Sequence, residues 1–122
     1  MLRKLHNKVG VRCFVNDLSK PVMPQEYFLD KIINEIEDGA RYFVCASNNQ
    51  NDLRFSLAVH AARLMYPEFR IHLVVVIPDK ENEEFVNKFS NCNLFLHAPA
   101  SCFGEVYKLI VRKMAEKTIC ID

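Results

Sequence analysis

Glycine is scarce in this chain, and neither sign of charge is in excess. The 122 residues include three glycines, and none of them lies in the polar segment of residues 47–52. Glycine lets backbone amides adopt positive φ and approach a phosphate closely, so the usual phosphate-cradling loop is missing there. A formal net charge of +1 also lacks the basic excess of nucleic-acid-binding proteins. We therefore expect no nucleic-acid partner.

Long apolar runs are absent as well. No run approaches the roughly 18 residues of a membrane span, and the basic N-terminus lacks the apolar stretch of a secretory signal. The five cysteines cannot all pair within one chain. Cys13, Cys45 and Cys120 fall in predicted buried strands, where cysteine acts as a small hydrophobe. These features predict a cytoplasmic protein with no membrane partner.

Motifs for metal binding or catalysis are incomplete. Cys92, His97 and Cys102 have a C-x4-H-x4-C spacing, but they lack a paired C-x-x-C and a fourth ligand, so we expect no metal site. Cys45 paired with His60 or His72 would be a nucleophile, but a buried structural cysteine is the commoner case. With no Ser-His-Asp motif, paired catalytic carboxylates or P-loop, we expect no catalytic residue and no cofactor, and a binding protein rather than an enzyme.

The clearest positive signal is one βαβ unit over residues 39–78. Its pattern predicts a strand over 42–46, a helix that Asn51 or Asp52 caps and that runs to about residue 65, and a strand over 71–77. The second strand is nearly all aliphatic, which is typical of a strand covered on both faces. We expect it to form the centre of the sheet.

The rest of the chain continues the same alternation of strands and helices. Further strands are expected over residues 12–15, 94–96 and 118–121, and further helices over 25–38, 80–89 and 105–117. Right-handed crossovers between such elements give a parallel sheet with helices on both sides. We therefore predict a single α/β domain over residues 1–122, a three-layer Rossmann-like sandwich with a mainly parallel five-stranded sheet.

Two segments carry a resemblance to a known family. Residues 39–59 are similar to the pattern G-x-x-x-F-I-x-G-x-A-x-G-x-D-x-x-x-A-E, and residues 66–78 to Y-P-x-I-x-L-x-x-x-x-P. Over about residues 9–122 the chain resembles the SLOG superfamily, a Rossmann-like group that includes the Lonely guy proteins and DNA-processing protein A, and most closely its YpsA-like branch. Phe43 falls on the strand aromatic of that pattern and Asp52 on its loop aspartate.

The chain also departs from that family. The two glycines of the pattern fall on Ala46 and Gln50, and its helical glutamate falls on Leu57. Residue 122 is reached before the glycine-rich phosphate loop that the family has after its fourth strand. The resemblance thus implies the fold of a nucleotide-binding family, with a degenerate site.

Position still points to a ligand site in the polar loop, because ligands of open α/β sheets bind at the carboxyl ends of the strands. Polar side chains would replace the missing glycine amides, and Arg54 would clamp a phosphate. The alternative is a solvated turn that only caps the helix. The candidate ligand-binding residues are Ser47, Asn48, Asn49, Gln50, Asp52 and Arg54.

Two functions from different classes remain. The first is a non-catalytic SLOG-like module that binds a nucleotide or nucleotide-derived small molecule. The second is a protein-binding accessory or inhibitory module, of the kind that phages and mobile elements carry, that has lost the nucleotide site. Phe69, Phe103 and Tyr107 at element edges, and the broad apolar face of residues 105–117, predict an interface. A homodimer is the expected homo-oligomer, and a protein target is the alternative partner.

Overall fold

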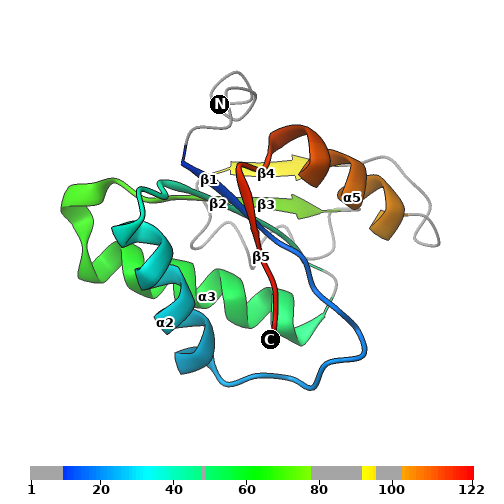
Figure 1. Ribbon diagram of the computed structural model, residues 1–122, viewed down its shortest axis with the longest axis horizontal. Helices are drawn as coiled ribbons and strands as arrows, with labels where there is room; N and C mark the ends of the chain where they lie inside the picture. Colours follow the sequence, from blue (N-terminus) through cyan, green and yellow to red (C-terminus); the bar gives the residue numbers. More distant parts are fainter. Residues whose placement is uncertain (1–9, 48, 78–91, 96–102) are drawn as a thin grey trace.

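The computed structural model describes residues 10–47, 49–77, 92–95 and 103–122, in which strands and helices alternate (Figure 1). The strands are β1 (Val11–Phe14), β2 (Tyr42–Ala46), β3 (His72–Ile77), β4 (Cys92–Phe95) and β5 (Lys117–Ile119). The helices are α2 (Gln25–Glu37), α3 (Gln50–Met65), the short 3₁₀ helix η1 (Pro67–Phe69) and α5 (Phe103–Met114). The helix predicted over residues 80–89 lies outside the described residues. The predicted α/β class with a parallel sheet is confirmed.

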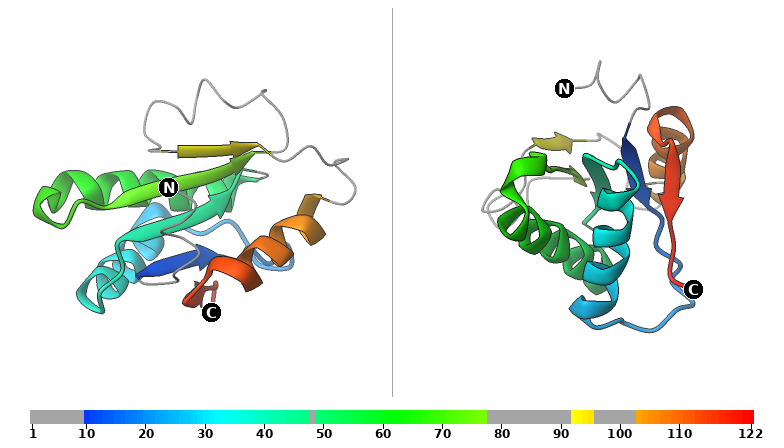
Figure 2. Two further views of the ribbon diagram at one scale, coloured as in Figure 1. Left: turned by 90° about the horizontal axis from the view of Figure 1, so that it is seen from above. Right: turned by 60° about the vertical axis from the view of Figure 1, so that its left-hand side comes forward.

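The order of the strands contains one reversal. They are hydrogen-bonded in the order β4-β3-β2-β1-β5, and every neighbouring pair is parallel. The chain steps in one direction from β1 to β4 and then returns to place β5 on the other side of β1. Because parallel crossovers are right-handed, this reversal puts α5 on the opposite face of the sheet from α2 and α3 (Figure 2). The topological switch point therefore lies between β1 and β5.

The aliphatic strand β3 is buried as predicted, but it is not central. Leu73, Val74, Val75 and Val76 have no exposed surface, and parallel strands flank β3 on both sides. The middle strand is β2, so the expectation that residues 71–77 form the centre of the sheet is wrong. The chain returns past β1 and adds β5 beside it, so β2 becomes the middle strand. The local sequence pattern of a strand does not encode this order.

An aromatic cluster fills the face of the sheet that α2 and α3 cover. Phe14 on β1 stacks on Phe55 of α3 with ring centroids 4.6 Å apart, and Phe28 of α2 meets Phe14 edge-on at 5.4 Å. Ala58 and Ala62 of α3 are buried, and their small side chains let this helix approach the sheet closely. Offset and edge-on ring pairs of this kind add to the stabilisation from burial alone.

The opposite face packs against α5 in a way that the sequence predicted only in part. Val111 and Met114 are buried, whereas Leu109 is 61% exposed. Tyr107, expected at the surface, is buried, because its hydroxyl finds backbone acceptors in the sheet. Cys120 was expected in a buried strand but is exposed, because β5 ends at Ile119.

The start of α3 also differs from the prediction. Asn49 is the N-cap, with an extended backbone and a side-chain Oδ1 that accepts a hydrogen bond from the backbone N–H of Asp52 at 3.1 Å. The expectation that Asn51 or Asp52 caps this helix is therefore wrong. Asn49, Asn51 and Asp52 can each cap a helix, and the first of them in the chain does so here.

Two glycines bring the beginnings of the strands together. Gly10 (φ 69°) and Gly39 (φ 102°) both have left-handed backbones. The Gly10 carbonyl accepts hydrogen bonds from the backbone N–H groups of Arg41 and Tyr42, at 2.8 and 3.0 Å. A Cβ at Gly10 would lie 3.0 Å from the Gly39 carbonyl oxygen, so a larger residue would press on this backbone oxygen and would also be strained by the positive φ.

A fully buried arginine lies at the same end of the sheet. Arg12 on β1 contacts three carboxylates. Its Nε lies 2.5 Å from Glu35 of α2, and its Nη2 lies 3.1 Å from Asp38, the C-cap of that helix. Its Nη1 lies 3.2 Å from Glu116. Lys117 also donates to Asp38 at 2.6 Å, and this hydrogen bond lowers the pKa of Asp38. Acidic residues at the carboxyl end of a helix oppose its dipole, and the guanidinium supplies the compensating positive charge.

Replacing this buried cation tests its structural role. Arg12→Met keeps much of the length of the side chain but leaves three carboxylates without their partner, so the free energy of unfolding should fall by about 3 kcal/mol. Urea denaturation followed by circular dichroism measures the change. Arg112→Met, at an exposed position on α5, is the matched control and should leave the midpoint within error. Equal midpoints for the two variants would contradict the role assigned to Arg12.

Candidate functional site

A cleft of about 810 Å³ opens at the carboxyl ends of the strands. This volume falls within the usual range for small-molecule sites, about 300–1,000 Å³. Segments that are far apart in the sequence meet here, because parallel strands end at the same edge of a sheet. The described lining comprises Val15, Asn16, Asp17 and Leu18 after β1; Ala46, Asn49 and Asp52 after β2; Gly104, Glu105, Tyr107 and Lys108 of α5; and Cys120 and Ile121 after β5.

The cleft coincides with the topological switch point. The segment that follows β1 leads to α2 on one face of the sheet, whereas α5, which leads into β5, begins on the opposite face. Such divergence leaves a crevice outside the strand ends, and this crevice is where open α/β sheets bind ligands. The first turns of α5 form one wall of the crevice.

Part of the wall is apolar. Leu18 is 83% exposed although it is a large hydrophobic residue, and it lies at the cleft with the partly buried Val15 and the buried Ile121. Exposed apolar side chains beside a cleft are typical of surfaces that a ligand covers.

The polar groups of the cleft are mainly hydrogen-bond acceptors. The Oδ1 atom of Asn16 is buried and has no hydrogen-bond partner. Asp52 is only 2% exposed, and Glu105 is exposed. Asp17 accepts hydrogen bonds from the backbone N–H and the hydroxyl of Ser19, at 2.9 and 2.7 Å, and these bonds lower the pKa of Asp17.

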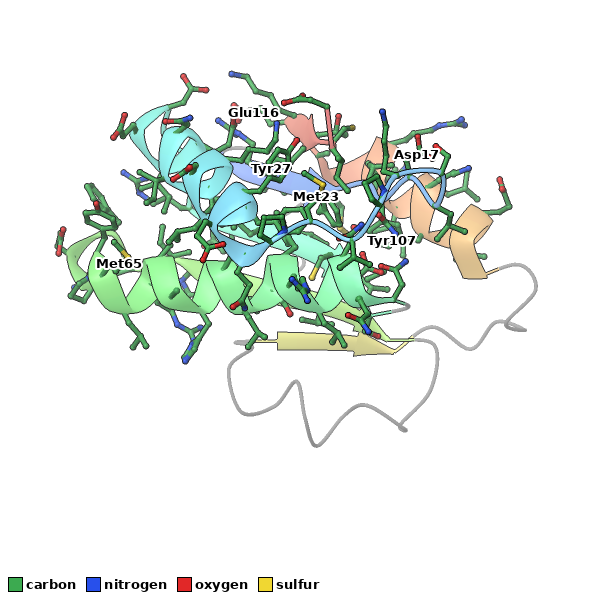
Figure 3. The ribbon with its side chains drawn as sticks, turned by 90° about the horizontal axis from the view of Figure 1, so that it is seen from below. Asp17, Met23, Tyr27, Met65, Tyr107 and Glu116 are labelled. Carbon is green, nitrogen blue, oxygen red and sulfur yellow. The ribbon has the colours of Figure 1, made fainter. Side chains whose placement is uncertain are left out.

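Tyr107 fixes the position of α5 at the base of the cleft. Its hydroxyl donates to the carbonyl oxygen of Phe14 at 2.8 Å and lies 3.4 Å from that of Val44, so it links α5 to β1 and β2. Burial raises the pKa of Tyr107 well above its ordinary value, and the hydroxyl stays protonated as a donor. Figure 3 shows Tyr107 and Asp17 at the same end of the molecule.

The predicted site residues are only partly brought together. Asn49 and Asp52 line the cleft, whereas Gln50 is exposed at the first position of α3. Ser47 is 5% exposed, and its Oγ is buried without a hydrogen-bond partner. Asn48 lies outside the described residues. A ligand-binding role of this loop therefore stays a prediction.

Two residues in the first turns of α3 hold the loop between β1 and α2. The Arg54 guanidinium donates to the carbonyl oxygen of Met23 at 3.2 Å. The side chain of Asn51 accepts from the N–H of Met23 at 2.9 Å and donates to the carbonyl oxygen of Pro21 at 3.0 Å. These contacts position the loop that carries Asn16, Asp17 and Leu18, so this end of α3 shapes the cleft from behind.

Reasoning from the sequence missed most of the cleft. It predicted ligand-binding residues after β2 but none after β1 or in the first turns of α5. The same positional rule, applied to the end of every predicted strand, would have identified Asn16, Asp17 and Leu18. Glu105, Tyr107 and Lys108 carry no such signal, because their place depends on the order of the strands.

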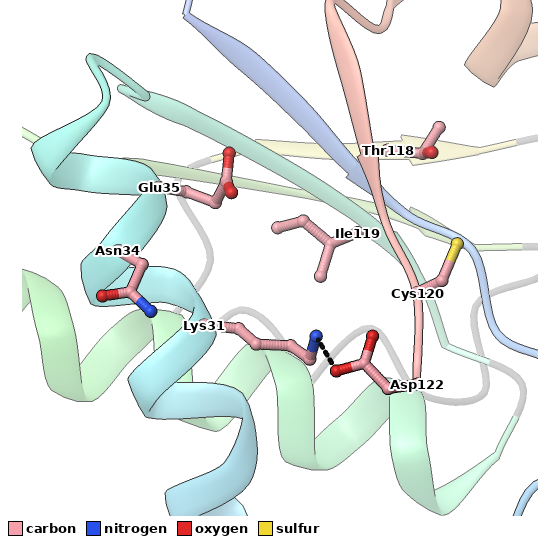
Figure 4. Close-up of a pocket in the computed structure, with 7 residues that line it drawn as sticks. All are labelled: Lys31, Asn34, Glu35, Thr118, Ile119, Cys120 and Asp122. Atoms are coloured by element: carbon pink, nitrogen blue, oxygen red, sulfur yellow. Dashed lines mark hydrogen bonds and ion pairs between the residues drawn. The ribbon is translucent and has the colours of Figure 1, made fainter.

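A smaller pocket of about 360 Å³ lies between α2 and residues 118–122, which comprise the end of β5 and the segment after it (Figure 4). Lys31 of α2 pairs with Asp122 across it at 2.9 Å. Their hydrogen bond raises the pKa of Lys31 and lowers that of Asp122. Since these two charges already satisfy each other, the pocket offers a ligand less than the larger cleft does.

The described residues give little support to covalent or metal chemistry. Burial raises the pKa of Cys45 well above its ordinary value, and a protonated thiol is a poor nucleophile. Within the described ranges, no group of His, Cys, Asp or Glu side chains could hold a metal ion. His97, Cys102 and the side chain of Cys92 lie outside those ranges. None of the described helices is long and apolar enough to cross a membrane.

Comparison of the chain with protein-family models, with curated proteins and with solved structures gives no match.

The cysteines should differ sharply in reactivity. Burial raises the pKa of Cys13 to about 12 and that of Cys45 well above its ordinary value, whereas Cys120 is exposed at the cleft. Iodoacetamide at pH 8 should therefore modify Cys120 at least ten times faster than Cys13 or Cys45. Peptide mass spectrometry of the native protein measures the three rates, and a urea-unfolded sample is the control. Comparable rates in the native protein would contradict the burial of Cys13 and Cys45.

Proposed function

We propose that this chain is a non-catalytic, SLOG-like module that binds a nucleotide or a nucleotide-derived small molecule. The observation that carries the proposal is the cleft of about 810 Å³ at the switch point between β1 and β5. Its fold is proposed to be a three-layer Rossmann-like sandwich, in which this crevice is the expected ligand site.

The composition of the cleft suits a ligand with one flat apolar part and one polar part. Leu18, Val15 and Ile121 offer an apolar wall against which a nucleobase can pack. Asn16 and Asp52 supply polar groups at fixed positions beside it. A few polar groups set within an otherwise apolar wall are typical of small-molecule sites.

Blocking the cleft tests the proposal. A Cβ at Gly104 would meet no atom within 4 Å, and Gly104 lines the cleft, so Gly104→Phe should fill it without strain. Isothermal titration calorimetry with adenosine, AMP and ADP-ribose should detect binding to the parent protein, weakened at least tenfold in this variant. The matched control Arg112→Phe, exposed on the same helix outside the cleft lining, should bind as the parent does. Absence of binding to the parent by all three probes would contradict the proposed function.

Two further measurements locate the ligand. A bound probe should slow the alkylation of Cys120, which lines the cleft. Gln50→Ala should leave the affinity unchanged if the ligand occupies the cleft, because Gln50 is exposed and is not among the described residues that line it. A loss of about 1.5–3 kcal/mol in that variant, typical of a hydrogen bond to a charged group, would instead place the ligand on the loop of residues 47–54.

An exposed apolar side chain supports the second candidate function, a protein-binding accessory or inhibitory module of the phage or mobile-element type. Leu109 of α5 is 61% exposed, and its neighbours Val106 and Ile110 are only partly buried. A helix that packs only on a sheet needs a single apolar stripe, so the surplus favours a second contact. A homodimer would provide that contact.

Self-association tests this second candidate. In static light scattering at high micromolar concentration, the parent protein should form dimers and Leu109→Ser should be monomeric, because the substitution removes apolar surface from the contact. Leu64→Ser, which changes a similarly exposed leucine on α3, is the control and should remain dimeric. A monomeric parent would contradict the homodimer.

A further inference from the structure

We infer that the cleft at the switch point recognises the hydrogen-bond donors of its ligand, the sugar hydroxyls and amino groups of a nucleoside, and leaves any phosphate outside. This inference rests on the proposed function and specifies which part of the ligand the site binds. It differs from the usual scheme of such sheets, in which backbone amides cradle a phosphate.

The first support is the amide of Asn16. Its Oδ1 is an acceptor that is buried at the cleft and has no hydrogen-bond partner. A buried acceptor without a partner destabilises the folded state, and a hydroxyl or amino group of a ligand would remove that penalty. A phosphate oxygen is itself an acceptor and would leave the atom unsatisfied.

The second support is the buried carboxylate of Asp52. This residue is 2% exposed, and its negative charge reaches the surrounding groups. Burial is the main reason for the raised pKa of both Cys45 and Tyr107, and the charge of Asp52 contributes to both shifts. A negative field at the cleft favours donors and cations and opposes a phosphate.

The third support is the balance of charge over the described lining. Asp17, Asp52 and Glu105 contribute three carboxylates, against the single ammonium group of Lys108. None of the described lining segments supplies a glycine-rich turn, and Gly104 lies within a helix. The groups that normally compensate a phosphate are therefore outnumbered by groups that repel it.

Paired probes test the inference. Isothermal titration calorimetry would compare adenosine, guanosine, cytidine and uridine with their 5′-monophosphates, at 50 and 300 mM salt. The best nucleoside should bind at least tenfold more tightly than its monophosphate at low salt. The difference should shrink at high salt, because salt screens the repulsion from the exposed carboxylates.

Variants separate the two kinds of polar group. Asn16→Ala should weaken nucleoside binding at least tenfold, because it removes the acceptor. Glu105→Gln should tighten binding of the monophosphate severalfold relative to that of the nucleoside, because it removes repulsion from an exposed position. Glu68→Gln, an exposed carboxylate outside the lining of the cleft, is the control and should change neither affinity.

The outcomes distinguish this inference from the proposed function. Binding of no probe by the parent protein would overturn both. Tighter binding of the monophosphate than of the nucleoside would overturn the inference and leave the proposed function standing. An Asn16→Ala variant that folds, as its circular dichroism would show, and binds the nucleoside normally would also overturn the inference.

Discussion

The structure depends on a positive charge that is fully removed from water. Arg12 is buried in β1, and its guanidinium contacts carboxylates from α2, from the C-cap of that helix and from the residue before β5. A buried charge is tolerated only when it is paired in this way, so the contacts require β1, α2 and β5 to stay together. They thereby hold the pair of strands between which the order of the sheet reverses. The cleft exists because these two strands are neighbours.

The two ends of the sheet thus have different roles. At the amino ends of the strands, charges are paired and the backbone is tightly constrained, as around Arg12 and Gly10. At the carboxyl ends, Tyr107 and Asn51 hold the surrounding elements in place, but the polar groups that face the cleft include an acceptor with no partner. The paired charges are concentrated at one edge of the sheet, and the cleft proposed as a binding site lies at the other.

Much of the fold was predictable from local patterns, and the site was predictable only in part. The aliphatic run of β3 and the small residues of α3 identified the βαβ unit, because burial on both faces leaves a clear composition. Asn49 was missed as the cap because adjacent polar residues are equivalent by propensity. The positions of Tyr107 and Glu105 depend on which strands are neighbours, and that order is set by the whole chain. Arg12 was not recognised as a buried residue, since its partners are 23 or more positions away.

The scarcity of glycine has a consequence for how this protein can change. Two of its three glycines, Gly10 and Gly39, provide left-handed backbone where the strands begin, far from the cleft. The segments that follow β1, β2 and β5 contain none, so these segments bring side chains to the cleft in place of the backbone amides that cradle a phosphate in glycine-rich sites. A binding surface made of side chains can be altered one substitution at a time without rebuilding a loop. Under the proposed function, the specificity of the cleft would therefore be open to gradual divergence, while the scaffold beneath it stays fixed.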